Sequence, residues 1–294
     1  CSLLYTDRSN VIGAALVSFF LNKKKVILRL LGMQKTFVNY INSNSLIPFI
    51  FRLAYKSDFD TIIGTNDGSS IKNFIREFTQ KNINKYVETN GVNKVKYSKL
   101  KKNDQFKIIF LGRLEKNKGI YYFLETLKLL RENNVKNIKV EIIGDGNERK
   151  KVNLFCKKHD LEKFVTIYGS IEHSKVLTKL SNSDIYVSLN NDGQISNSNL
   201  EATSAGLCLI FGKTISENDK TAIDFGYNNN NVFWIDKNVN DHLFKIISNL
   251  ISNPSEIIQR KKNTRKLSSK IKTISERINW EINIIKNHLI DYEK

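Results

Sequence analysis

Hydrophobic residues along this 294-residue chain follow two patterns that alternate. Short continuous apolar runs are typical of strands buried on both faces, and stretches with apolar residues every three or four positions are typical of helices that pack on one side. Residues 69–81 show the helical pattern, with apolar side chains at Ile71, Phe74, Ile75 and Phe78. The alternation of strands and helices predicts the α/β class, with parallel sheets covered by helices on both faces.

The first hundred residues predict an incomplete domain. Strands are expected at residues 25–31, 60–64 and 85–89, and helices at residues 9–21, 45–56 and 69–81. A doubly wound domain usually has more strands, and a Gly-rich turn often follows its first strand. We therefore expect the first strands of this domain to be missing. The polar, Lys-rich stretch at residues 93–105 is the predicted linker.

The rest of the chain predicts a complete second domain. Strands are expected at residues 106–111, 138–143, 164–167, 184–189, 207–211 and 232–235. Helices are expected at residues 118–133, 148–159 and 173–180, and again from residue 241 to the end, with breaks at Pro254 and at Ser268-Ser269. This order predicts one parallel sheet.

The segment 188–211 has the pattern of a strand, a polar loop, a short helix and a second strand. Small polar residues in the loop let backbone N–H groups approach an anion, and Ser196, Asn197 or Ser198 can cap the helix. We expect Glu201 in the first turn of this helix and Gly206 at its end. From the local sequence alone, Glu201 would complement the helix dipole as well as it would bind a ligand.

Three more turns follow predicted strands. Gly112 begins the first, with Arg113 and Lys118 in a position to bind a diphosphate, although two solvated surface cations would look the same. Residues 143–146 form an I-G-D-G turn, which by itself is a weak signal. Tyr168 and Gly169 end another strand, where a flat base could lie. Because the carboxyl ends of parallel strands share one sheet edge, these turns and the Glu201 loop should lie together.

The net charge of +18 and a pI of about 9.6 suggest an anionic partner: nucleotide phosphates, anionic lipid or nucleic acid. A proteome rich in Lys, Asn and Ile would explain part of the excess. No helix-turn-helix, zinc-finger or RNA-recognition pattern occurs, so we expect no nucleic-acid partner. Basic runs at residues 23–25 and 260–272 suggest contact with an anionic membrane surface.

Other features of the composition argue against metal, disulfide and membrane-spanning classes. Three scattered cysteines and four scattered histidines predict neither a disulfide framework nor a metal site, and Cys208 lies in an apolar run typical of a core. His173 opens a predicted helix and is interpreted as a residue satisfied by a partner or by solvent. The apolar stretch at residues 11–21 is too short to span a bilayer. A reducing cytoplasm fits this cysteine usage.

Four motifs together resemble the nucleotide-binding half of family-4 retaining glycosyltransferases. They are G-R-L-x-x-x-K-G at 112–119, I-G-D-G at 143–146, Y-G at 168–169 and S-N-S-N-L-E-A-x-x-A-G at 196–206. T-N-G-V at 89–92 is similar to the turn that ends the first domain of this family, and N-W-E at 279–281 is similar to its last helix. Residues 1–32 resemble the middle of that first domain. The resemblance implies the GT-B fold, two Rossmann-like domains with parallel sheets, the first incomplete here.

The resemblance also implies domain boundaries and site residues. Residues 1–103 would form the partial acceptor-side domain, residues 104–275 the nucleotide-sugar domain, and residues 276–294 a helix that returns to the first. Arg113 and Lys118 would bind the diphosphate of a UDP- or GDP-linked donor, and Glu201 the ribose hydroxyls. The other expected contacts are Gly112, Tyr168, Gly169, Asp192, Gly193, Ile195, Ser196, Asn197, Ser198, Asn199 and Leu200. No metal and no cofactor beyond the donor sugar are expected.

One departure from the family pattern leaves two functions open. The family often has a second acid eight positions before Glu201, where this chain has Gly193, with Asp192 beside it as a substitute. The Gly-rich loop and histidine of the family's first domain have no counterpart, and Leu31-Gly32 stands where His-Gly often occurs. The chain is expected to be a cytoplasmic hexosyltransferase, peripheral on the membrane, with a lipid-linked or polysaccharide acceptor. The alternative is a non-catalytic member that binds a nucleotide sugar or a partner.

Overall fold

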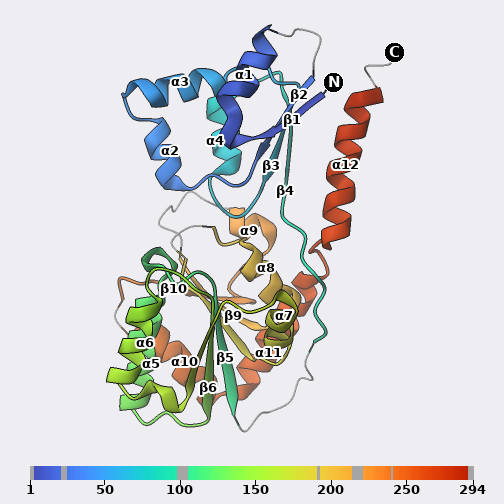
Figure 1. Cartoon of the computed structure of the whole chain (residues 1–294). Helices are drawn as coiled ribbons and strands as arrows, with labels where there is room; N and C mark the ends of the chain where they lie inside the picture. The colour runs from blue at the N-terminus through green and yellow to red at the C-terminus, as the bar shows by residue number, and fades with distance from the viewer. Residues whose placement is uncertain are drawn as a thin grey trace. The chain divides into compact units, whose positions relative to one another are not determined.

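The computed structural model describes residues 3–20, 25–97, 105–190, 193–213, 221–239 and 241–290. The chain forms two compact units, Cys1–Gly91 with Lys272–Lys294, and Val92–Ile271 (Figure 1). Each unit has its own parallel sheet and its own hydrophobic core. Among the described residues, no helix is both long enough and apolar enough to cross a membrane.

The sheet of the first unit has four parallel strands in the order β1-β2-β3-β4. They are β1 (Leu3–Asp7), β2 (Lys25–Leu30), β3 (Thr61–Thr65) and β4 (Asn84–Glu88). The helices of this unit are η1 (Arg8–Asn10), α1 (Val11–Phe20), α2 (Lys35–Ile41), α3 (Leu46–Tyr55), α4 (Ile71–Phe78) and α12 (Ile274–Ile290). Sequence patterns missed β1, which lies at the sheet edge with no fully buried residue, and α2, which buries only Ile41.

The two faces of this first sheet pack against different helices. Apolar residues of α1 to α4 cover one face, and α12 covers the other, where Ile284 packs with Ile27 and Ile63 (Figure 1). The carboxylate of Glu281 in α12 forms ion pairs with Arg29 at 2.8 Å and with Arg277 at 2.6 Å. Burial raises the pKa of Glu281, but the hydrogen bond from Tyr5 and the two arginines lower it more, so its pKa falls below the usual range. The carboxylate therefore stays ionised and holds α12 to the sheet.

The sheet of the second unit has six parallel strands in the order β10-β9-β8-β5-β6-β7. They are β5 (Phe106–Leu111), β6 (Ile138–Ile143), β7 (Val165–Gly169), β8 (Ile185–Ser188), β9 (Cys208–Gly212) and β10 (Val232–Ile235). The helices are η2 (Lys116–Lys118), α5 (Ile120–Glu132), α6 (Arg149–Lys158), η3 (Leu161–Lys163), α7 (His173–Ser181), α8 (Asn197–Ser204), α9 (Thr221–Phe225), α10 (His242–Ser252) and α11 (Pro254–Ser268). All six strands were predicted from apolar runs, whereas the five-residue α9 was not.

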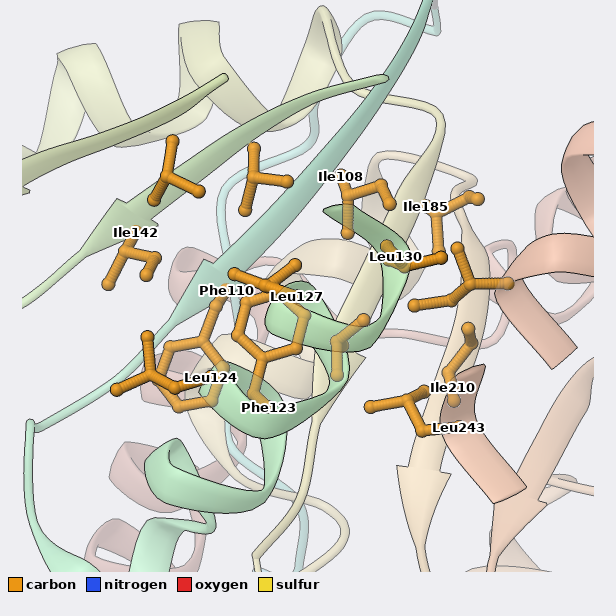
Figure 2. Packing of buried hydrophobic residues seen from close by; sticks show 14 of the residues in the cluster. Ile108, Phe110, Phe123, Leu124, Leu127, Leu130, Ile142, Ile185, Ile210 and Leu243 are labelled. Atoms are coloured by element: carbon orange, nitrogen blue, oxygen red, sulfur yellow. The ribbon is translucent and has the colours of Figure 1, made fainter. Parts of the chain in front are cut away.

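Both faces of this second sheet are buried, which explains why its strands are continuous apolar runs. On one face, Ile108 and Phe110 of β5 pack against Phe123, Leu124 and Leu127 of α5 (Figure 2). The rings of Phe110 and Phe123 stack with centroids 5.5 Å apart. Helices α7 and α8 cover the opposite face. Cys208 is fully buried, as predicted, and burial raises the pKa of its thiol to about 12.

A buried ion pair joins α11 to the start of β8. Lys261 is 3% exposed, and its ammonium donates to Asp184 Oδ1 at 3.1 Å, while the backbone N–H of Lys107 donates to Asp184 Oδ2 at 3.1 Å. We expect Lys261→Met to lower the free energy of unfolding by about 3 kcal/mol, because it leaves a buried carboxylate without its cation. Chemical denaturation measures this effect.

The neighbouring Lys262 provides the control, because it is exposed. Lys262→Met should change the free energy of unfolding by less than about 0.5 kcal/mol. If Lys261→Met and Lys262→Met unfolded with the same free energy, the ion pair between Lys261 and Asp184 would make no measurable contribution to stability.

Candidate functional site

The strand order places a topological switch point between β5 and β8. From β5 the chain proceeds through β6 to β7 on one side, then returns to β8 beside β5 and proceeds through β9 to β10 on the other. Ligands of open parallel sheets bind outside the carboxyl ends of the strands at such a point. The turn at residues 112–119 follows β5, and the loop at residues 189–196 follows β8. Both predicted motifs therefore flank the switch point.

The turn after β5 is locked against the turn after β6. The N–H of Gly112 donates to Ile143 O at 3.0 Å, and that of Leu114 donates to Asp145 O at 2.9 Å. Gly144 has φ +136°, and a Cβ there would lie 1.9 Å from Gly112 O, so only glycine allows this approach. The backbone that carries the candidate phosphate-binding cations is therefore rigidly placed.

The side chain of Arg113 is largely open to solvent. It is 64% exposed, and its guanidinium pairs with Glu115 at 3.0 Å. An exposed ion pair of this kind contributes little to stability, so it can exchange for a stronger anion at small cost. Arg113 is thus available to a ligand at the sheet edge.

Lys118 ends the short helix η2, and the following Gly119 has φ +73°. The predicted helix at residues 118–133 begins later, at Ile120, because this left-handed residue interrupts it. A Cβ on Gly119 would lie 2.4 Å from Leu189 Cβ and 2.7 Å from Leu189 O. The turn after β5 and the loop after β8 therefore touch here, which brings Lys118 to the base of the Glu201 loop.

Helix α8 begins at the loop after β8. Ser196 is its N-cap, one of the three predicted candidates, and its hydroxyl accepts from the N–H of Asn199 at 3.4 Å. Glu201 is the fifth residue of α8, in its second turn, so the prediction of a first-turn acid was wrong and the helix-dipole interpretation of Glu201 does not apply. Gly206 follows the end of the helix with φ +68°, as predicted.

The predicted loop contacts divide into buried and accessible residues. Buried Asn199 accepts from the hydroxyl of Tyr186 at 2.8 Å and donates to Gln194 O at 2.9 Å. Ile195 and Leu200 are buried in the core. These three side chains hold the loop and are not available to a ligand. The residues open to solvent are Gly193, Ser196, Asn197 and Ser198; Asp192 lies outside the described residues.

The carboxylate of Glu201 contacts His173, the first residue of α7, with Oε1 and Nε2 2.9 Å apart. Glu201 is partly buried and His173 is exposed. His173 therefore has a partner, as interpreted from the sequence, but the sequence did not show that this partner is the candidate ribose-binding residue. The two residues are 28 positions apart, and only the packing of α7 beside α8 brings them together.

At the end of β7, the side chain of Tyr168 is part of a polar network. Its hydroxyl donates to Glu141 at 3.1 Å and accepts from Lys179 at 2.6 Å. Burial lowers the pKa of Lys179, but hydrogen bonds to Glu141 and Tyr168 raise it above its usual value. Because this network holds the side chain of Tyr168, only the backbone of Tyr168, next to Gly169, is available to a ligand at the carboxyl edge of the sheet. Two inter-strand spacings, about 10 Å, separate β7 from β5.

Three residues at the sheet edge were not predicted. Arg149 pairs with Asp145 at 2.6 Å, and a Cβ on Gly169 would lie 2.8 Å from its guanidinium. The pKa of Asp145 is lowered mainly by the hydrogen bond from the N–H of Gly146, and further by the hydrogen bond from Arg149. Lys237, after β10, donates to Leu189 O at 3.0 Å, and burial lowers its pKa. Gln194 is buried and donates to Gly212 O at 3.2 Å. No pattern along the sequence points to these contacts.

The chain belongs to the family described as glycosyl transferases group 1, whose model matches residues 92–267. That match covers the second unit and its candidate site almost entirely. No curated protein matches the chain by sequence.

Several solved structures have the same fold. HepE of Anabaena, in complex with UDP and glucose, has a TM-score of 0.73 at 15% identity over 97% of this chain and 77% of its own. Sucrose-phosphate synthase from Thermosynechococcus elongatus has a TM-score of 0.72 at 14% identity over 99% and 74%. The C-terminal domain of LpcC from Francisella tularensis has a TM-score of 0.51 at 20% identity over 62% and 99%. The predicted GT-B fold class, two α/β units with parallel sheets, is confirmed.

Proposed function

We propose that this chain transfers a hexose from a UDP- or GDP-linked donor with retention of configuration and without a metal ion. The acceptor is a lipid-linked sugar or a growing polysaccharide. One observation carries the proposal: Arg113 and Lys118 lie in the turn on one side of the switch point, and this turn touches the Glu201 loop on the other side through Gly119 and Leu189. The UDP and glucose held by HepE support this choice of donor.

Each residue has a role that follows from its chemistry. The guanidinium of Arg113 and the ammonium of Lys118 neutralise the departing diphosphate, which removes the need for a metal ion. The carboxylate of Glu201 accepts hydrogen bonds from the two ribose hydroxyls. Backbone at residues 195–199 meets the diphosphate or sugar, and backbone at Tyr168 and Gly169 lies near the base. The acceptor attacks from the face of the leaving group, and the donor phosphate takes its proton.

Glu201 gives this proposal a direct test. We expect Glu201→Gln to bind UDP about tenfold more weakly than the unchanged chain, because a neutral amide accepts less strongly and presents only one acceptor oxygen. Both chains should bind 2′,3′-dideoxy-UDP with nearly the same affinity. Calorimetry measures the four affinities. If Glu201→Gln lowered the affinity for UDP and for the dideoxy compound equally, Glu201 would not bind the ribose hydroxyls.

A non-catalytic binding protein is the second candidate. Gly193 occupies the position at which the family often has an acid, and its φ of +77° lies in the left-handed region, which glycine adopts more easily than any other residue. The loop is therefore shaped for glycine at this position. Incubating the protein with UDP- and GDP-sugars and glycan acceptors tests the alternative. Binding of UDP without any release of nucleotide diphosphate would favour it over the transferase.

We propose a cytoplasmic location with contact to an anionic membrane surface, where lipid-linked acceptors are found. Of the two basic runs considered for this contact, residues 260–272 are largely committed elsewhere. Lys261 is buried with Asp184, Arg260 pairs with Glu256, and Lys272 pairs with Glu88. Of the basic residues in this run, only Lys262, Lys266 and Lys270 are exposed. The other run, at residues 23–25, lies outside the described residues except for Lys25, which donates to His288 O at 2.8 Å.

A further inference from the structure

The hydrogen bond between His173 and Glu201 connects two segments that leave the carboxyl edge of the second sheet. His173 begins α7, which follows β7, and Glu201 lies in α8, which follows β8. The atoms in contact are Nε2 of His173 and Oε1 of Glu201, 2.9 Å apart. A carboxylate can only accept a hydrogen bond, so Nε2 carries the proton and donates it. Oε2 of Glu201 and the second lone pair of Oε1 stay available to a ligand.

His173 is what fixes the orientation of this carboxylate. Among the residues that the structure describes, no other side chain forms a hydrogen bond or an ion pair with the carboxylate of Glu201. Its neighbours in α8, Leu200 and Ala202, are apolar and buried in the core. A glutamate side chain has three rotatable bonds, and ordering it when a ligand binds costs conformational entropy. A carboxylate that is already held avoids much of this cost.

Stability does not explain the contact. The side chain of His173 is 51% exposed and that of Glu201 is 13% exposed, and polar pairs that are open to solvent on one side contribute little to the free energy of unfolding. The ion pair of Lys261 with Asp184 in the same unit is different, because both side chains are buried. We therefore expect the loss of His173 to change ligand binding more than it changes stability.

The position of His173 also suits the two parts of the proposed nucleoside site. His173 follows Tyr168 and Gly169 by only a few residues, and backbone at these two residues is proposed to lie near the base. Helix α7 packs beside α8, which carries the carboxylate proposed for the ribose. The hydrogen bond thus joins the segment next to the base to the residue next to the ribose.

We propose that His173 is a positioning residue, which donates from Nε2 to Glu201 and so holds the carboxylate in place for the ribose hydroxyls of the donor nucleotide. The inference rests on the ribose-binding role of Glu201 in the proposed function and adds a second residue to it. His173 acts through Glu201 and does not itself contact the nucleotide.

His173→Leu tests the inference, because leucine fills similar space but donates no hydrogen bond. This variant should bind UDP about fivefold more weakly than the unchanged chain, since ordering one flexible side chain lowers affinity by a factor of about two to ten. It should bind 2′,3′-dideoxy-UDP like the unchanged chain and keep the same melting temperature. His173→Gln, whose amide nitrogen can take the place of Nε2, should restore most of the UDP affinity. Calorimetry measures the affinities.

Two further comparisons separate this role from a general effect of losing a histidine. In a Glu201→Ala background, His173→Leu should cause no further loss of UDP affinity, because the group that His173 positions is already gone. His159→Leu is the matched control. His159 ends α6 at the opposite edge of the sheet, where its ring lies 4.4 Å from that of Phe155, and this variant should bind UDP like the unchanged chain.

Several results would overturn the inference. They are an unchanged UDP affinity in His173→Leu, an equal loss for UDP and for dideoxy-UDP, equally weak binding by His173→Gln, and a further loss in the Glu201→Ala background. If Glu201→Gln weakened UDP binding and His173→Leu did not, the inference alone would fail. If neither change affected UDP binding, the ribose-binding role of Glu201 in the proposed function would fail as well.

Discussion

Arg113→Ala combined with Lys118→Ala should weaken the binding of UDP or GDP about a hundredfold. Each cation would make a charge-assisted hydrogen bond to the diphosphate, and such a bond contributes about 1.5–3 kcal/mol, so two losses of at least 1.4 kcal/mol give this factor. The turn that carries both residues should keep its shape, because it is held by backbone contacts of Gly112 and Leu114. Titration calorimetry with each nucleotide measures the effect, and the melting temperature should stay unchanged.

The chain offers a control that removes the same charge from α5, the helix that follows this turn. Lys128 and Arg131 lie in the second half of α5, where they pair with Glu125, Glu132 and Asp160. Lys128→Ala with Arg131→Ala changes the net charge equally but leaves the sheet edge intact. It should bind UDP within about twofold of the unchanged chain at moderate salt, because distant surface charges are screened. Similar losses in the two double variants would refute a specific phosphate site at residues 113–118.

Gly144→Ala should cost the second unit about 3 kcal/mol of stability and also reduce nucleotide binding. The new Cβ would lie 1.9 Å from Gly112 O at a φ of +136°, so backbone must move at one of the two turns. Strained backbone at a single residue costs about 1–3 kcal/mol, and the broken contact between the turns adds to it. Because the displaced turn carries Arg113, the phosphate-binding cations should move as well. Urea unfolding and UDP titration measure the two effects.

Gly112→Ala is the control, because it introduces backbone strain at a positive φ without a collision of the new Cβ with another atom. Gly112 has φ +158°, but a Cβ there would meet no atom within 4 Å. Its substitution should therefore destabilise the unit by only about 1 kcal/mol and leave most of the UDP affinity. If Gly144→Ala proved no less stable than Gly112→Ala, the close approach of the two turns would not be what requires glycine at position 144.

The strands of the second unit could be predicted because each is a continuous apolar run. The expected bounds of β5, β6 and β10 agree with the structure, since both sheet faces are buried and every residue of such a strand is under the same constraint. The first unit was harder. β1 has the half-exposed pattern of an edge strand, and its five residues are too few to show a period. Helix α2 has seven residues, and its apolar positions Phe37, Val38 and Ile41 span little more than one turn, which is too short to establish a period.

The candidate site could be predicted only in part. Glycines and cations that follow strands indicate which turns reach the sheet edge, because parallel strands end on the same side. The contacts within the site depend on conformation. Glu201 was placed one turn too early in its helix, since three consecutive residues were equally good caps and only packing selects Ser196. Lys237 reaches Leu189 across 48 positions, and nothing near either residue in the sequence indicates this hydrogen bond.

Local patterning by itself determined the α/β class, the strand runs of the second unit and the turns that carry Gly112, Arg113, Lys118 and Glu201, because burial acts on each residue through a period of two or 3.6 positions. Only the tertiary structure decided which turns touch, that His173 meets Glu201, and that Lys261 is buried while Phe19 is exposed. Those outcomes depend on strand order and helix packing, which join residues far apart in the chain and leave no periodic trace in it.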